Sequence, residues 1–377
     1  MLVKFLLFLA MLLLQLQSTI AHAEASCLRS VDERPKIGLV LGGGGARGAA
    51  HIGVIQKLEE LRVPVDIVTG TSMGSIVGGL HATGMSGSEL EELVVKIDWP
   101  ELFKDDTRRA DQPFRRKRDD DLSLFGPKLG VGKNASLLPQ GAISGQKISF
   151  FFESVVNQHV QTRDFDQFPI PFRAVAADII TGKQVVLDQG DLALAMRASM
   201  SIPGAFAPVQ QNDYMLVDGG IVNNIPVDVA RNMGADIIIA VDVGTPLQGR
   251  EKLGNLVAIT AQLSGLMVVN NSKAQLATLG TNDFHVAPAL GNDISSSDFA
   301  HIAKAIPLGY QATDALSDKL LPLALTPEAY ATYRQQIRAC QTGLPVVQFV
   351  EIVNKSRFRD AVITEKLHTV IGQPLDT

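Results

Sequence analysis

Short apolar runs alternate along the chain with stretches in which apolar residues recur at helical spacing. The run IGLVL at 37–41 precedes the helix-like AAHIGVIQKLEELR at 49–62. The run PVDIVTG at 64–70 precedes SMGSIVGGLHATG, whose final Gly84 is suited to end a helix. Continuous apolar runs are typical of strands that are buried on both faces. The pattern therefore predicts an α/β fold with a mostly parallel central sheet covered by helices.

The alternation continues through the middle of the chain. Further strands and one helix are predicted at FRAVAAD (172–178), DLALAMRASM (191–200), APVQQ (207–211), YMLVD (214–218) and ADIIIAVDV (235–243). Turn-forming pairs at 181–182 and 212–213 predict two tight hairpins. Ser88 and Glu91 have the spacing of a helix capping box.

One long segment interrupts this rhythm. Residues 100–145 are charged and glycine-rich with little periodicity, and a loop of this length inside a compact domain usually has a function. The basic run at 115–118 is followed at once by three aspartates, so the local charge nearly cancels. The segment is a solvated excursion, a lid, or a basic strip for anionic head groups.

Composition limits the classes of function. The 377 residues are enough for one large domain and a smaller part. The chain is 46% hydrophobic and 19% charged, with a net charge of −5, so no overall positive field attracts nucleic acid. Nucleic acid is therefore not expected as a partner.

The first 23 residues have the three parts of a secretory signal. One lysine precedes a leucine-rich core, and Ala21-His22-Ala23 forms a small-residue cleavage site. The apolar stretch is shorter than the about 20 residues that a membrane span needs. We expect a cleaved signal peptide and an exported protein, located in the periplasm, at the outer membrane, at the cell surface or outside the cell.

Two cysteines occur, Cys27 and Cys340. In an exported chain they could pair, or they could be two unrelated thiols. No HExxH or CxxC spacing is present, so no metal site is expected.

The strongest chemical signal is GTSMG at 70–74. A serine flanked by Gly70 and Gly74, after a strand and before a small-residue helix, is typical of a nucleophile elbow. The elbow would present the Ser72 hydroxyl at the edge of the sheet, where the helix N-terminus favours negative charge.

The glycine-rich GGGGARG at 42–48 has two interpretations. Gly43, Gly45 and Gly48 satisfy the dinucleotide-binding pattern G-x-G-x-x-G. That fold also requires an acid at the end of the second strand, where this chain has the serine elbow. Asp66 lies at the start of that strand instead, so the dinucleotide interpretation fails. A run of glycine N–H groups beside Ser72 would form an oxyanion hole. Arg47 could add positive charge to this hole, or it could anchor the loop.

A serine nucleophile needs a proton acceptor. Histidines 51 and 81 are predicted within helices, where they would cap or pack, and His285 has no special turn chemistry around it. Asp218 is the better candidate, because it ends a strand and precedes two glycines. Burial would raise its pKa and make it a stronger base.

Together these segments resemble the patatin-like phospholipases. The resemblance assigns the nucleophile to Ser72 and the second member of a Ser-Asp dyad to Asp218. It assigns an oxyanion loop to Gly43, Gly44, Gly45, Ala46, Arg47 and Gly48, and motif glycines to Gly70, Gly74, Gly219 and Gly220. Residues 197–209 and 222–230 look like flanking segments of the family, and the resemblance covers roughly residues 36–310. It implies a patatin-like three-layer sandwich, a dyad without histidine, and phospholipid ester hydrolysis without a metal or another cofactor.

The carboxyl-terminal segment gives a second resemblance. LPVVQFVEIV at 344–353 is predicted as a strand and SRFRDAVITEKLHTVIG at 356–372 as an amphipathic helix. This strand-helix segment resembles the opening of a POTRA module, as found before the outer-membrane barrel of patatin-like autotransporters. The alternative is a strand-helix appendage that packs on the main domain.

The expected organisation is a signal peptide at 1–23, a patatin-like phospholipase domain at 24–325, a helical linker at 326–344 and a partial POTRA-like segment at 345–377. The predicted function is an exported phospholipase of the A type, with phospholipid membranes as partner. An outer-membrane barrel domain outside this chain is a further expected partner, and no oligomeric state is predicted. The alternatives are a catalytically silent lipid-binding module of a type V secretion passenger and a nucleotide-binding protein.

Overall fold

The computed structural model describes residues 34–105, 114, 130–131, 136–137, 140–157, 162–291, 294–341, 346–354, 359–361, 364 and 371–374. The predicted signal peptide, Cys27 with its possible pairing, and the basic run at 115–118 lie outside these residues. In the described part, none of the helices has both the length and the apolar character needed to cross a membrane.

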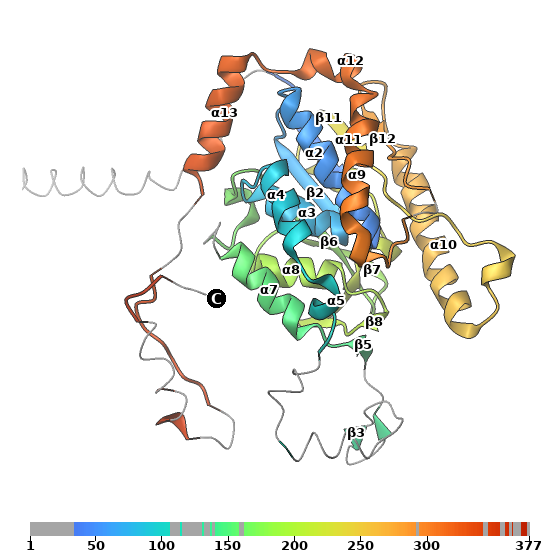
Figure 1. Ribbon diagram of the computed structural model, residues 1–377, viewed down its shortest axis with the longest axis vertical. Coiled ribbons are helices and arrows are strands. Elements are labelled where there is room, and N and C mark those ends of the chain that lie inside the picture. Colours follow the sequence, from blue (N-terminus) through green and yellow to red (C-terminus); the bar gives the residue numbers. More distant parts are fainter. Residues whose placement is uncertain are drawn as a thin grey trace, which may run out of the picture.

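One eight-stranded sheet forms the centre of the molecule (Figure 1). Its strands are β1 (Ile37–Leu41), β2 (Ile67–Thr71), β6 (Phe172–Asp178), β7 (Lys183–Leu187), β9 (Val209–Gln211), β10 (Tyr214–Asp218), β11 (Ile237–Val241) and β12 (Phe284–Val286). They are ordered β12-β11-β1-β2-β6-β10-β9, and β7 pairs with β6. The five strands from β12 to β6 run parallel, and the hairpin strands β7, β9 and β10 run antiparallel to their neighbours. The mostly parallel sheet confirms the predicted fold class.

Helices cover both faces of the sheet. The α-helices are α2 (Ala50–Glu60), α3 (Met73–Ala82), α4 (Gly87–Lys96), α5 (Trp99–Leu102), α7 (Gln146–Val156), α8 (Leu192–Ser199), α9 (Val227–Asn232), α10 (Leu256–Leu276), α11 (Ile306–Asp314), α12 (Ser317–Leu320) and α13 (Pro327–Ala339). Short 3-10 helices are η1 (Gly45–Ala49), η3 (Phe165–Gln167), η4 (Gly219–Ile221), η5 (Arg250–Lys252), η6 (Phe299–Ala305) and η7 (Leu321–Leu323). Two further pairs of short strands lie outside the main sheet, β3 (Gly130–Val131) with β4 (Ser136–Leu137) and β5 (Gly141–Ile143) with β8 (Gly204–Phe206).

Strand β1 shows how the layers arise from the sequence. Leu39 and Leu41 point into the larger core, which α2, α3, α8 and α11 complete. Val40, between them, points into a smaller core that α9 closes on the other face. Because successive side chains of a strand point to opposite faces, a continuous apolar run needs cover on both sides. The result is a three-layer sandwich.

The predicted capping box lies two residues earlier than expected. Ser86 is the N-cap of α4, its N–H donates to Glu89 Oε2 at 2.8 Å, and the Glu89 N–H donates to Ser86 Oγ at 3.3 Å. Ser88 is already inside the helix, so the predicted pair of Ser88 and Glu91 was wrong. Ser86 has the extended backbone that an N-cap requires.

Helix α13, within the segment predicted as a linker, packs on the main body. The Tyr333 hydroxyl donates to the carbonyl of Val65 at 2.8 Å and accepts from its N–H at 3.1 Å. Arg334 pairs with Glu59 at 2.9 Å, and Ile337 is buried. The helix therefore adds to the body rather than standing free of it.

The carboxyl-terminal strand that the sequence predicts does not form in the described residues. Residues 346–354 contain an isolated antiparallel bridge between Val346 and Pro374, where the Val347 N–H donates to the Gln373 carbonyl at 3.0 Å. Residues 348–354 join no ladder among the described residues. A β-propensity run becomes a strand only when another strand accepts its hydrogen bonds. Most of the predicted helix at 356–372 lies outside the described residues.

Candidate active site

Strand β6 brings the ends of β2 and β10 together. β2 runs parallel to β6 and ends with Thr71 beside Val175. β10 runs antiparallel to β6 and ends with Asp218 beside Ala176. Strand β7 pairs with residues 174–178 of β6 along one edge of β6. Strands β2 and β10 therefore both pair along the opposite edge of β6, and their carboxyl ends meet there. Ser72 directly follows β2 and therefore lies next to Asp218.

Ser72 occupies a tight turn between β2 and α3. Its φ of 54° and ψ of −124° are rarely adopted by residues other than glycine and indicate backbone strain. A side chain at Gly74 would come within 2.0 Å of the Leu41 carbonyl oxygen, and one at Gly70 within 2.3 Å of the Gly74 carbonyl oxygen. The two glycines are required because this turn leaves no room for a side chain. This is the geometry of a nucleophile elbow.

The Ser72 hydroxyl donates a hydrogen bond of 2.6 Å to Oδ2 of Asp218. The other carboxylate oxygen, Oδ1, accepts from the Gly220 N–H at 2.7 Å. Both side chains are buried. Burial raises the pKa of Asp218 to about 6, although the hydrogen bonds from Ser72 and Gly220 act to lower it. Asp218 is thus mostly ionised at neutral pH and is a stronger base than an exposed carboxylate.

The glycine loop after β1 lies against the serine. A side chain at Gly43 would come within 3.0 Å of Ser72 Cβ. The Gly43 N–H donates to the Asn224 carbonyl at 3.2 Å, so it holds the loop in place. Within the described part of the chain, the N–H groups of Gly44 and Gly45 have no acceptor. They are the donors of this loop that can bind an oxyanion.

The second half of the predicted oxyanion loop is held by contacts with other segments. The Ala46 N–H donates to the Ser296 carbonyl at 2.8 Å, and Gly48 packs against Met73. The guanidinium group of Arg47 donates to three backbone carbonyl groups, those of Val243, Gly291 and Ile294. Of the two roles considered for Arg47, the structure therefore favours the anchor. These three residues position the loop that the resemblance assigned to 43–48 as a whole.

The two helical histidines pack internally. His51 is fully buried with Nε2 at 2.7 Å from the Gly42 carbonyl, and burial lowers its pKa to about 4. His81 Nδ1 lies 2.8 Å from the Met85 carbonyl. Both side chains bind backbone inside the core, as the sequence indicated.

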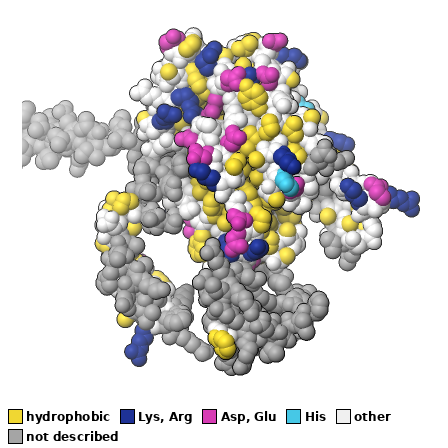
Figure 2. Space-filling model, in the orientation of Figure 1, with side chains coloured by type: hydrophobic (Ala, Val, Ile, Leu, Met, Phe, Trp, Pro, Cys, Tyr) yellow, Lys and Arg dark blue, Asp and Glu magenta, His cyan; other side chains and the backbone are white. Residues whose placement is uncertain are grey.

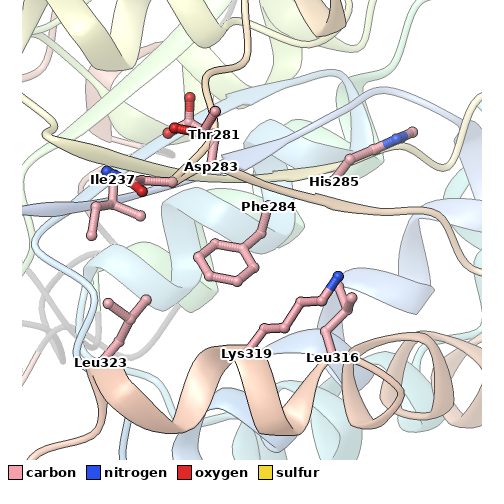
Figure 3. Close-up of a pocket in the computed structure, with 9 residues that line it drawn as sticks. Ile237, Thr281, Asp283, Phe284, His285, Leu316, Lys319 and Leu323 are labelled. Atoms are coloured by element: carbon pink, nitrogen blue, oxygen red, sulfur yellow. The ribbon is translucent and has the colours of Figure 1, made fainter.

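His285 lies beside a different cavity, of about 550 Å³ (Figure 3). In the close-up its side chain points away from Phe284, which faces the helical segment bearing Leu316 and Lys319. Among the described residues that line the cavity at Ser72 there is no histidine.

The cavity at Ser72 has a volume of about 340 Å³. Ser72, Asp218 and the backbone of 43–45 form its polar end. Its walls are largely apolar and come from 202–203, the loop at 245–247 and α10. Such a cavity fits an acyl chain whose ester group reaches the polar end.

The sequence alone did not indicate the residues that support this site. The Ser72 N–H donates to Ser199 Oγ at 2.9 Å, and the Ser199 hydroxyl donates to the Val175 carbonyl at 2.6 Å. Ser199 thereby ties the elbow to β6. It lies in the segment 197–209, which was noted only as a flanking segment.

Helix α10 also reaches both reactive loops. Asn271 accepts from the Asn224 N–H and donates to the Gly220 carbonyl, each at 2.8 Å. Asn224 in turn contacts the glycine loop through Gly43. The signal that could have drawn attention to α10 is its lack of any charged residue before Lys273.

In the described part of the chain, no group of three or more His, Cys, Asp or Glu residues is arranged to hold a metal ion. The geometry at Ser72 is that of a serine hydrogen-bonded to a carboxylate at the edge of a sheet, beside a set of backbone donors.

The chain was compared with known proteins. Patatin-like phospholipase domain-containing protein 6 of Mus musculus is 34% identical over 226 residues, which is 59% of this chain and 15% of that protein. An uncharacterized NTE family protein of Mycobacterium tuberculosis is 35% identical over 209 residues, 55% of this chain and 49% of that protein. The chain thus spans half or less of the length of these relatives.

Among solved structures, VipD from Legionella pneumophila superposes with a TM-score of 0.40 at 16% identity, over 76% of this chain and 67% of that one. The sequence model of the family described as Patatin-like phospholipase matches residues 39–231, which is just over half of the chain and includes all three motifs. The chain belongs to the patatin-like phospholipase family.

Proposed function

We propose that this protein is a serine lipid acyl hydrolase of the phospholipase A type. Ser72 is the nucleophile, Asp218 the general base, and the N–H groups of Gly44 and Gly45 bind the oxyanion. The observation that carries the proposal is the 2.6 Å hydrogen bond from the Ser72 hydroxyl to a buried carboxylate, at the polar end of an apolar cavity. Membership of the patatin-like family supports the substrate class, an ester of a fatty acid.

Acylation begins when the Ser72 oxygen attacks the ester carbonyl carbon. Its proton moves to Asp218 Oδ2, with which it is already hydrogen-bonded. The carbonyl oxygen becomes an oxyanion beside the glycine loop and the N-terminus of α3. The tetrahedral intermediate collapses, the C–O bond to the glycerol breaks, and the leaving alkoxide takes the proton from Asp218. The products of this half-reaction are a lysophospholipid and an acyl-Ser72 ester.

Deacylation repeats these steps with water. Asp218, again ionised, accepts a proton from a water molecule as its oxygen attacks the acyl carbon. Collapse of the second intermediate breaks the bond to the Ser72 oxygen, which recovers the proton from Asp218. A free fatty acid leaves, and the hydrogen bond between the two side chains re-forms.

The test is fatty-acid release from mixed phospholipid vesicles, with a chelator present. Ser72→Ala and Asp218→Asn should each lose turnover by at least about a thousandfold, since each removes a member of one unit. His285→Ala is the matched control, because its side chain lines another cavity, and it should release fatty acid at the wild-type rate.

Three results would contradict the proposal. Loss of turnover in His285→Ala would favour a triad over the dyad. Loss of wild-type activity on adding the chelator would indicate a metal-dependent reaction. Lipid capture by the wild type without any released fatty acid would favour the silent lipid-binding module.

Export and the cellular setting are part of the proposal. Residues 1–23 support a cleaved signal peptide. The autotransporter context rests on the sequence resemblance at 345–377 alone, because the described residues there do not form the predicted strand. On this interpretation the enzyme acts on phospholipid membranes from the periplasm, outer membrane or cell surface. Amino-terminal sequencing of the purified mature protein tests it, and a chain that retains residues 1–23 would contradict it.

A further inference from the structure

Helix α10 is apolar on more than one face. No aspartate, glutamate, lysine or arginine occurs between Lys252 and Lys273. The carboxyl-terminal part of the helix is anchored through Asn271 and the buried Ser272. The amino-terminal part extends at the edge of the molecule, together with the loop before it (Figure 1). A helix without a polar face is usually covered by other apolar material.

One face of α10 lines the cavity at Ser72. Ala261, Gly265 and Val268 belong to this face. The loop before the helix is held against it, because the Gln248 N–H donates to Gln262 Oε1 at 3.1 Å and Gln262 Nε2 donates to the Gln248 carbonyl at 3.2 Å. The loop and helix thus form one wall of the cavity.

The other face of α10 is exposed and apolar. Ile259, Leu263, Leu266 and Met267 recur at helical spacing and are 46%, 58%, 38% and 50% exposed. At the rim of the cavity, Leu247 adds further exposed apolar surface. Contiguous exposed apolar surface of this kind indicates an interaction site.

Basic side chains border this surface. Arg250 and Lys252 lie in η5, just before α10, and are exposed. Glu251 lies between them and is also exposed, and Figure 2 shows basic side chains with an acidic one between them at the outer end of the lobe that carries α10. Lys252 also lines the cavity at Ser72 and is the only cation among the described residues that do so. A cation at this position is suited to bind a lipid phosphate.

We propose that the exposed face of α10, formed by Ile259, Leu263, Leu266 and Met267, docks on a phospholipid bilayer. The apolar side chains enter the interface between head groups and acyl chains, and Arg250 and Lys252 contact phosphate groups. Docking in this orientation brings the rim of the cavity to the lipid surface, so that one acyl chain can pass from the bilayer to Ser72. The inference rests on the proposed function for its substrate.

The bilayer is favoured as the occupant because the surface is continuous with the cavity. A second copy of the chain seated on the same face would cover Leu247 and Lys252 at the rim and obstruct entry of a lipid. Arg250 and Lys252 complement the phosphate groups of lipids. A second copy of the chain offers less complementary charge, because its net charge is only −5.

The test measures co-sedimentation of the full chain with vesicles of phosphatidylcholine and phosphatidylglycerol. Ser72→Ala is the background, so that the vesicles stay intact. Adding Leu263→Gln with Met267→Gln should weaken binding about tenfold, as expected for the loss of two partly inserted apolar side chains. Val95→Gln, on α4 and 56% exposed, is the matched control and should bind like the background. Arg250→Gln with Lys252→Gln should weaken binding to these anionic vesicles more than to pure phosphatidylcholine.

A second readout separates this inference from the proposed function. With Ser72 intact, the Leu263→Gln and Met267→Gln double variant should hydrolyse a water-soluble, monomeric short-chain ester at the wild-type rate. If neither protein hydrolyses that ester while vesicle binding still depends on α10, the docking surface stands and the hydrolase proposal fails. Equal vesicle binding by background and double variant would overturn the docking surface. The docking surface would also be overturned if the double variant changed from dimer to monomer while its vesicle binding stayed the same. The exposed face of α10 would then be an interface with a second copy of the chain.

Discussion

The Asp218 carboxyl group is buried and accepts two hydrogen bonds, and burial and hydrogen bonding act on its pKa in opposite directions. Burial is the larger effect and raises the pKa to about 6. Below that pH the group carries a proton and cannot accept another from Ser72. If Asp218 is the base, as proposed, its pKa also sets the lower limit of the active pH range.

The first prediction concerns this limit. We expect kcat/KM on a soluble ester to rise with pH and level off, with an apparent pKa near 6. His51 cannot cause this rise, since burial holds its pKa near 4. A pH–rate profile from about pH 4.5 to 8.5 measures it. If a rise near pH 6 persisted in the residual activity of Asp218→Asn, another group would be the base.

The same shift predicts a gain in stability for an inactive variant. Between 3.8, the ordinary pKa of an aspartate, and about 6, the folded protein binds more protons than the unfolded chain. Ionisation of Asp218 therefore lowers the free energy of unfolding as the pH rises through this window. Asp218→Asn should be more stable than wild type by up to about 3 kcal/mol at pH 8. At pH 4 the two should be nearly equal.

Denaturant unfolding at both pH values measures this difference. A gain of the same size at pH 4 and pH 8 would contradict the linkage, because it would not depend on the charge of residue 218. A stable but inactive variant would show that the site gives up stability for reactivity.

At the scale of elements, the site depends on three chain reversals that meet at one sheet edge. In the proposed mechanism, the turn after β1 supplies the donors, the turn after β2 the nucleophile and the turn after β10 the base. Gly43 lies where two of these turns touch. A side chain there would come within 2.6 Å of Asn224 Oδ1 and 3.0 Å of Ser72 Cβ.

We therefore predict that Gly43→Ala displaces the loop that carries the oxyanion donors. Turnover should fall on the order of a hundredfold, the effect of losing one such donor. Gly254→Ala is the matched control, since a side chain there meets no atom within 4 Å. Steady-state kinetics on a soluble ester and a thermal unfolding curve check both variants. A fall in melting temperature without a fall in kcat would argue against the assignment of this loop.

At the scale of the whole molecule, α13 packs on the main body beside the start of β2 and the end of α2. The Tyr333 hydroxyl satisfies both the N–H and the carbonyl of Val65, just before β2. Tyr333→Phe would leave both backbone groups without this partner. Each buried group that loses its hydrogen bond costs about 1–3 kcal/mol of folding free energy. We expect a loss of about 2–4 kcal/mol in the free energy of unfolding, with kcat unchanged.

Tyr330→Phe is the control for this prediction. Its hydroxyl makes no hydrogen bond with the described residues, so its removal should change stability by less than about 0.5 kcal/mol. Equal effects of the two substitutions in chemical denaturation would show that the docking of α13 contributes little.

Much of the fold, and the positions of its motifs, could be predicted from the sequence. Buried strands such as 37–41 and 172–178 are marked by continuous apolar runs, and their bounds agree with β1 and β6. Ser72 was identified because glycines two positions before and after a serine, at the end of a strand, are characteristic of an elbow. The strand predicted at 344–353 does not form over the described residues 346–353, because apolar alternation does not show whether a partner strand is present.

The sequence by itself determined the layered α/β architecture and the three turns, because periodicity and glycine placement act locally. The tertiary structure alone decided which side chains meet. Asp218 lies 146 positions from Ser72 and reaches it only because β2 and β10 share one edge of β6. The fold also separated the donors at 44–45, which have no acceptor among the described residues, from residues 46–48, which hold the loop. Hydrogen bonds between distant segments and the burial they produce are properties of the folded chain, so no local pattern encodes them.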